Sequence, residues 1–210
     1  MRSILIFIAG FCSVANAMDT GAMIVGGYGS VIIHEAGHAL TLKILGAKIE
    51  AFRPYPTKVR YMQPGGESYD KWVLGLVKHE PFEGEDADRK QAWVAAMGSV
   101  TNLLSVFVLA PLLPELSSDF AKTSLDNMLL FSCFDGAAYS AADLIFKSPY
   151  NDWTKVSKLT GVSLYWYFGA NLIGGIMANS YRMHWHKKTF PNDKSSSDFA
   201  VGATFLNVGF

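Results

Sequence analysis

Long apolar runs separated by polar segments set the pattern of this chain. About 20 apolar residues in a helix cross the roughly 30 Å hydrocarbon core of a bilayer. Four runs reach that length, at residues 21–45, 92–113, 125–146 and 159–181. Glycine, proline or clusters of polar residues bound them, and these residue types end helices. The pattern predicts an all-α membrane protein with about four transmembrane helices.

A shorter apolar segment opens the chain. Arg2 precedes eleven mostly apolar residues, 4–14, which are followed by Ala15-Asn16-Ala17. A basic start, a short apolar core and an A-x-A ending are typical of a secretory signal peptide, and an uncleaved membrane helix is the alternative. Residues 1–17 are therefore expected to be a signal peptide or an N-terminal hydrophobic segment, and either one directs the chain to a membrane.

The polar segment 47–91 separates the first two long runs. It is rich in proline and glycine, and it contains three short runs typical of strands. These runs occupy residues 48–53, 58–62 and 71–78. We expect a small, partly β insertion between the first and second core helices. Residues 18–185 then form one membrane-embedded domain, and residues 186–210 form a polar C-terminal tail.

Composition supports a membrane protein and excludes other classes. Half of the residues are apolar, 17% are charged and the mean hydropathy is +0.18, which exceeds what a soluble domain of this size requires. The formal net charge is zero and no basic stripe is present, so nucleic acid is not an expected partner. Cys12 and Cys133 lack CxxC spacing, which argues against disulfides or a thiolate zinc site.

The distribution of basic residues predicts the orientation. With alternating spans, eleven lysines and arginines in segments 47–91 and 147–158 share one side, against five on the other. The side richer in basic residues is usually cytoplasmic. A cleaved signal peptide would place Met18 outside and gives the same orientation. We expect a multi-pass integral protein of a bacterial inner membrane.

The first long run carries ionisable residues, which are costly at membrane depth. They form the sequence His34-Glu35-Ala36-Gly37-His38. Two histidines four residues apart lie on one face of a helix, so that two imidazole nitrogens can bind one metal ion. This is the HExxH arrangement of zinc hydrolases, with His34 and His38 as ligands and Glu35 as general base. A chance match, or two histidines that only hydrogen-bond, is the alternative.

The second long run contains Gly98-Ser99-Val100-Thr101-Asn102. Its small residues would allow tight packing on the first helix. Asn102 either hydrogen-bonds between helices or contacts a substrate.

With a later aspartate, these motifs resemble the site-2 protease family of intramembrane zinc metallopeptidases, family M50. The resemblance covers roughly residues 22–156. The second motif of that family is usually Gly-Pro-x-x-Asn, so Ser99 replaces the proline while Gly98 and Asn102 keep the spacing. The resemblance implies that Asn102 binds the substrate.

The resemblance also implies an aspartate as the third zinc ligand, and two candidates are present. Asp152 lies beside a proline after an apolar run, as the family motif does, although Trp153 stands where glycine is usual. Asp135 precedes Gly136 and has the better spacing from Asn127, but it lies inside an expected helix. Asp152 is favoured, and Asp135 stays open.

The implied function is hydrolysis of membrane-embedded protein substrates within the lipid bilayer, with Zn²⁺ activating water and Glu35 as general base. Two other classes stay open. One is a non-catalytic M50-like protein that binds membrane helices. The other is a membrane metal-binding or transport protein that uses the same histidine pair.

Overall fold

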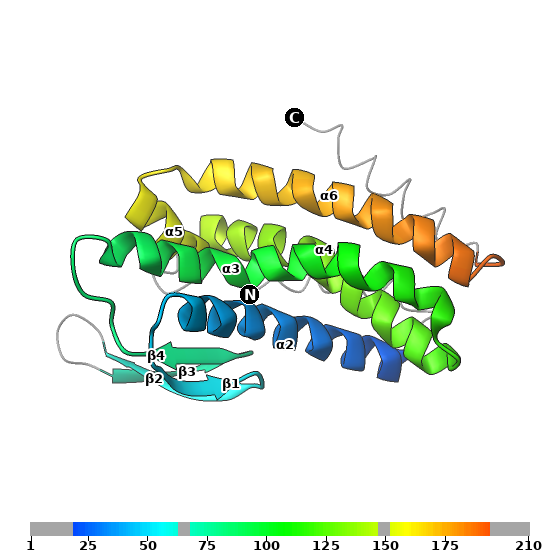
Figure 1. The fold of residues 1–210 in the computed structure, drawn as a ribbon, viewed down its shortest axis with the longest axis horizontal. Coiled ribbons are helices and arrows are strands. Elements are labelled where there is room, and N and C mark those ends of the chain that lie inside the picture. Colours follow the sequence, from blue (N-terminus) through cyan, green and yellow to red (C-terminus); the bar gives the residue numbers. More distant parts are fainter. Residues whose placement is uncertain (1–18, 63–67, 147–151, 194–210) are drawn as a thin grey trace.

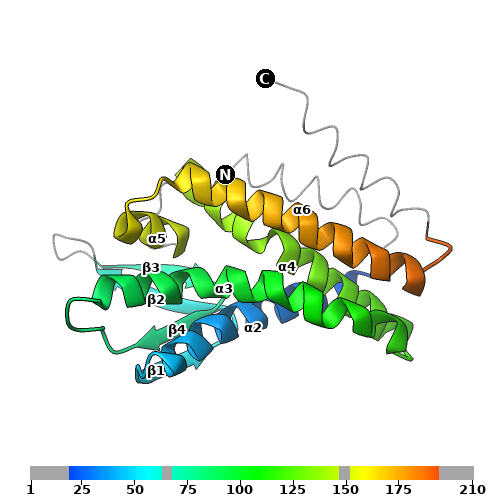
Figure 2. The same ribbon diagram turned by 45° about the horizontal axis from the view of Figure 1, so that its top comes forward.

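Helices pack side by side in one bundle, and a small β insertion lies at the end where α2 ends and α3 begins (Figures 1 and 2). The computed structural model describes residues 19–62, 68–146 and 152–193. The helices there are α2 (Thr20–Ile44), α3 (Ala87–Leu109), η2 (Ala110–Glu115), α4 (Asp119–Phe146), α5 (Asp152–Thr160) and α6 (Leu164–Thr189). The strands are β1 (Ile49–Arg53), β2 (Thr57–Met62), β3 (Ser68–Val73) and β4 (Leu76–His79). The expected signal segment lies outside the described residues.

Local signals place both ends of α2. The Asp19 carboxylate accepts hydrogen bonds from the backbone N–H groups of Gly21 and Ala22, which caps the helix start. After Leu45 the chain turns at Gly46, whose φ of 74° is open to glycine at little cost. The expected first helix, 21–45, is therefore confirmed to within one residue.

Small residues let the helices approach closely. A Cβ added at Gly26 would lie 2.6 Å from the backbone oxygen of Ser124 in α4, and one at Gly37 would lie 2.5 Å from that of Met97 in α3. Any larger residue would push α2 away from its neighbours. At the other side of the bundle a buried apolar cluster joins η2, α3, α4 and α6; it contains Val106, Ala110, Leu113, Leu129, Cys133 and Ala178.

The end of the helical region differs from the expectation. The apolar run 159–181 is not one helix, because Gly161 with φ 72° separates α5 from α6. Helix α6 then continues to Thr189, so the tail expected from residue 186 starts later. The extension follows from burial, since Arg182 and His186 turn inward to a carboxylate on α4. Residues 194–210 of the tail lie outside the described range.

That carboxylate belongs to Asp126, and it forms the centre of a buried ion cluster between α4 and α6. Arg182 Nη1 donates to its Oδ1 at 2.6 Å, and His186 Nδ1 lies 2.9 Å from its Oδ2. All three side chains are buried. Charges taken out of water in this way persist only when they are paired and hydrogen-bonded.

The β insertion is one bent two-stranded ribbon. β1 pairs with β4 and β2 with β3, both antiparallel, and the ladder is interrupted where residues 54–56 face Leu74 and Gly75. Pro54 and Pro56 have no backbone N–H to continue the ladder. The run expected as a single strand, 71–78, is therefore divided at Leu74–Gly75 between β3 and β4.

In the described residues, two helical segments are long and apolar enough to cross a membrane. They are α3 with η2, Ala87–Glu115, and most of α4, Asp119–Ile145. Proline at positions 111 and 114 accompanies the change from α-helix to the 3-10 helix η2 that ends the first segment.

Candidate metal centre

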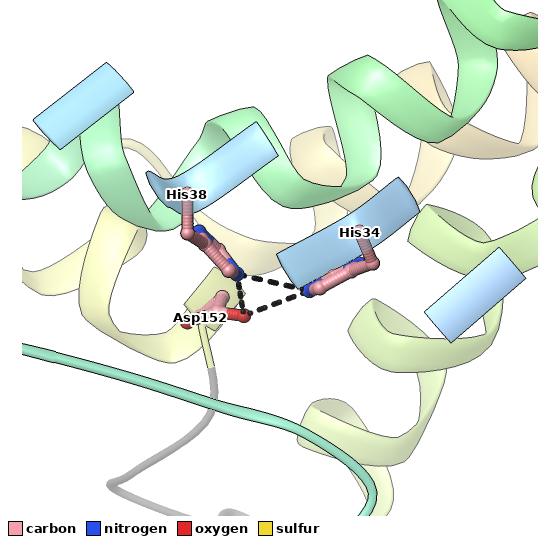
Figure 3. Close-up of side chains that lie close together, drawn as sticks. All are labelled: His34, His38 and Asp152. Carbon is pink, nitrogen blue, oxygen red and sulfur yellow. Dashed lines mark hydrogen bonds and ion pairs between the residues drawn. The ribbon is translucent and has the colours of Figure 1, made fainter. Parts of the chain in front are cut away.

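His34, His38 and Asp152 converge at one point of the bundle (Figure 3). The two histidines lie one turn apart on the buried face of α2, with 4% and 7% of their surfaces exposed. Asp152 is the first residue of α5 and lies at the same point, although it is 118 residues after His34 in the chain. The tertiary fold therefore brings together the two predicted histidine ligands and the favoured aspartate.

The spacing of the three donor atoms suits a tetrahedral ion. His34 Nε2 and His38 Nε2 are 3.0 Å apart, and Asp152 Oδ2 lies 3.4 and 3.3 Å from them, respectively. With metal–ligand bonds of about 2.0–2.2 Å, tetrahedral ligand atoms are separated by about 3.3–3.6 Å. The two distances to Asp152 fall within this range and the distance between the histidines is shorter, so the group could hold a metal ion with a fourth position left for water or substrate.

Hydrogen bonds on the outer side of each ring show which atoms face the centre. His38 Nδ1 lies 2.6 Å from the carbonyl oxygen of Val94, so Nδ1 carries the hydrogen and donates it. His34 Nδ1 lies 2.9 Å from Asp135 Oδ2 and does the same. Both Nε2 atoms then direct lone pairs inward. With both rings neutral, three electron-rich atoms lie within 3.4 Å of one another, and a cation between them would remove their mutual repulsion.

Gly98 of α3 leaves the space that such an ion requires. A Cβ at this position would lie 2.5 Å from His34 Nε2 and 2.6 Å from His38 Nε2. Any side chain would therefore press on the two inward-facing nitrogens. The glycine predicted to allow tight helix packing borders the donor atoms themselves.

The carboxyl group of Asp152 is held in its charged form. Burial raises its pKa, but the two neighbouring histidines and Lys155 together outweigh burial, so the pKa lies well below its usual range. Lys155 Nζ is 3.9 Å from the second oxygen, Oδ1. An ionised carboxylate is the form that binds a metal.

Glu35 lies beside this centre, on a cavity of about 320 Å³. The cavity is lined by the donor residues, by the bend of the ribbon from Trp72 to Val77, by the start of α3, and by Tyr139 and Lys155. Glu35 is buried, and a side chain at Gly75 would collide with its carboxylate. The ribbon thus closes over Glu35, and only a residue without a side chain allows that approach.

Asp135, the alternative third ligand, lies on the outer side of His34. Its Oδ2 bonds the nitrogen that faces away from the other two donors, and Ser99 Oγ donates to the same oxygen at 2.8 Å. Both aspartates weighed from the sequence thus contact His34, through different nitrogens. From the sequence, Ser99 was noted only as the replacement for a motif proline, and Val94 has no signal beyond an apolar helix.

Of the two roles considered for Asn102, the structure shows hydrogen bonds between helices. The residue is fully buried and does not line the cavity. Its Nδ2 donates to Ser30 Oγ at 3.2 Å, and its Oδ1 accepts from Ser132 Oγ at 3.5 Å. Asn102 therefore links α3 to α2 and α4, which corresponds to the interhelical alternative.

Two further residues at the centre had no recognisable signal in the sequence. Tyr139 stacks on the His34 ring, with centroids 5.3 Å apart and planes at 21°. Gly75 belongs to a run that reads as an ordinary strand. Their roles depend on contacts between segments that are distant in sequence.

Comparison with known proteins adds no identification: no family model, no curated protein and no solved structure matches this chain. The fold and side chains define a mostly helical protein with a small β insertion and a His34–His38–Asp152 group that could hold a metal ion.

Proposed function

We propose that this protein is an integral membrane zinc metallopeptidase, similar to the site-2 protease family, that hydrolyses peptide bonds of membrane-associated protein substrates. One observation carries the proposal. Three metal-type donor atoms from α2 and α5 lie within 3.4 Å of one another, on a cavity that also contains Glu35.

Charge around the centre favours a divalent ion. Glu35, Asp135 and Asp152 supply three carboxylates when ionised, and Lys155 is the single lysine or arginine among the cavity-lining residues of the described chain. Three negative charges against one positive charge leave two uncompensated. Zinc matches this surplus, the mixed nitrogen and oxygen donors and the tetrahedral spacing.

Two helices are long and apolar enough to cross a membrane, and the proposal adds two more membrane-spanning helices. In this proposal α2, α3, α4 and α6 all cross the bilayer. α2 and α6 have 25 and 26 residues, a length of about 38 Å at 1.5 Å per residue. Both expose large apolar side chains that a lipid environment would cover: Ile24, Val25, Leu40 and Ile44 on α2, and Ile173, Ile176 and Met177 on α6.

Aromatic residues at the start of α6 support the same placement. Tyr165 and Trp166 are about three-quarters exposed, as expected for side chains at a membrane interface. Helix α5, which begins with Asp152, lies at the end of the bundle that carries the β ribbon (Figure 1). By the count of basic residues this end is the cytoplasmic one, in a multi-pass protein of a bacterial inner membrane.

The residues of the site have distinct roles in this reaction. When bound, a zinc ion supplies Lewis acidity, which polarises a carbonyl and makes water more acidic. Glu35 accepts a proton as water attacks the peptide carbonyl carbon, and returns it to the amine nitrogen as the C–N bond breaks. A helical substrate has to unwind before cleavage, because its carbonyls are already hydrogen-bonded.

The test is zinc-dependent cleavage of a model transmembrane substrate by the full chain, purified in detergent. We expect Glu35→Gln to retain zinc and to lower the cleavage rate by about 10²–10⁴-fold, the usual contribution of a general base. His38→Ala should lose both zinc and cleavage.

The matched control is Glu83→Gln, which makes the same change at an exposed position outside the cavity lining. It should leave the rate unchanged. Cleavage that survives Glu35→Gln would exclude the peptidase mechanism. Zinc binding without any cleavage in the wild type would favour a metal-binding or transport role instead.

A further inference from the structure

We propose that Asp135 is a positioning residue for His34, and that Ser99 holds Asp135 in place, so that a hydrogen-bond relay across three helices sets the affinity of the metal centre. The relay runs from Ser99 on α3 through Asp135 on α4 to His34 on α2. It rests on the proposed function and extends it beyond the three donor atoms and Glu35.

The relay fixes the tautomer and orientation of one ligand. With a carboxylate oxygen 2.9 Å from Nδ1, the His34 ring carries its hydrogen on Nδ1 and keeps the Nε2 lone pair free for an ion. A carboxylate behind an imidazole also raises its basicity and hence its strength as a ligand. The His38 ring is held by the neutral carbonyl of Val94, so the two histidines are supported unequally.

Asp135 acts behind the ring and not as a ligand. Asp135 Oδ2 bonds His34 Nδ1, on the side of the imidazole away from Nε2. Asp135 Oδ2 and His34 Nε2 therefore cannot bind the same ion. Within the described residues, the donor group that could hold a metal contains Asp152 and not Asp135. The two aspartates therefore have different roles. Asp152 supplies a donor atom, and Asp135 orients the Nε2 donor atom of His34.

Ser99 supplies what a buried carboxylate needs to stay in position. The Asp135 side chain is 10% exposed, and a charge that buried requires hydrogen-bond donors. Its Oδ2 accepts from both the His34 ring and the Ser99 hydroxyl, at 2.9 and 2.8 Å. Proline, the residue usual here in the family that the chain resembles, has no hydroxyl. Serine in place of this proline therefore provides the hydroxyl that donates to Asp135.

The experiment measures the zinc affinity of the full chain in detergent by competition with a chelator. Asp135→Asn should weaken zinc binding by about 10–100-fold, the usual effect of removing an outer carboxylate. Asp126→Asn is the matched control, because it makes the same change on the same helix in a pair of the same length, with His186. It should leave zinc affinity unchanged.

A double-mutant cycle tests the role of Ser99. Ser99→Ala should weaken zinc binding less than Asp135→Asn does. The same substitution should have no further effect in an Asp135→Ala background, because Ser99 acts through Asp135. Equal losses in both backgrounds would overturn the relay.

Cobalt spectra distinguish positioning from ligation. The visible absorption of the Co²⁺-loaded Asp135→Asn protein should keep the wild-type coordination pattern, whereas Asp152→Ala should change it. Wild-type zinc affinity in Asp135→Asn would overturn the relay alone. A Co²⁺ spectrum altered by Asp135→Asn as strongly as by Asp152→Ala would make Asp135 a ligand. Absence of zinc binding by the wild type would overturn the metal centre itself.

Discussion

Helix α4 carries two aspartate–histidine pairs that are alike in length and different in setting. Asp135 lies 2.9 Å from His34 Nδ1, and Asp126 lies 2.9 Å from His186 Nδ1. At the first pair, the other ring nitrogen faces a second histidine and Asp152. At the second, Arg182 takes the remaining oxygen of Asp126.

The comparison shows that such a pair has no fixed role. Arg182 compensates the charge of Asp126, and the cluster joins α4 to α6. Around His34 lie the carboxyl groups of Glu35, Asp135 and Asp152, and a cavity adjoins the donor atoms. In the proposed function, the groups around each pair determine whether it stabilises the packing of two helices or supports a metal-binding site.

The largest predicted effect is a loss of unfolding free energy when the Asp126 pair is removed. Asp126→Ala leaves Arg182 buried without its carboxylate, and loss of one partner of a buried pair costs about 3–5 kcal/mol of unfolding free energy. Thermal unfolding in detergent measures the loss. Zinc affinity, measured below the unfolding temperature, should stay at the wild-type value. A parallel loss of affinity would show that the two pairs are not independent.

The next prediction concerns the space beside the His34 pair. Gly98→Ala puts a methyl group against both Nε2 atoms, and overpacking of this kind costs about 1–3 kcal/mol, or up to about 100-fold in zinc affinity. Gly169→Ala is the control, since a Cβ there meets nothing within 4 Å. Its zinc affinity should equal that of the wild type. Full affinity in Gly98→Ala would contradict the assigned ion position.

The smallest predicted effect concerns how α5 is held. Asp143 of α4 accepts a hydrogen bond from the backbone N–H of Thr154 at 2.9 Å, two residues after the donor Asp152. Asp143→Ala removes this cap-like contact, which is worth about 1 kcal/mol, or about fivefold in zinc affinity. Chelator competition measures the change. An effect larger than that of Asp135→Asn would place the main support of the centre on α5 and not on His34.

Local patterns accounted for much of the fold. The apolar runs correspond to α2, to α3 with η2, and to α4, and the polar segment contains the strands. The errors occurred at breaks. Gly161 divides the last run where its backbone takes a positive φ, and Leu74–Gly75 divides the last strand where the pairing partner changes from β2 to β1.

The sequence by itself determined that His34 and His38 share a helix face with Glu35 beside them, because a spacing of four residues is a property of the helix alone. It left two aspartates open as the third ligand and two roles open for Asn102, a hydrogen bond between helices or a contact with a substrate. Only the tertiary structure decided that Asp152 joins the donor atoms, that Asp135 lies behind His34, and that Asn102 links helices. These assignments depend on where α3, α4 and α5 meet α2, and close packing of small residues sets those distances.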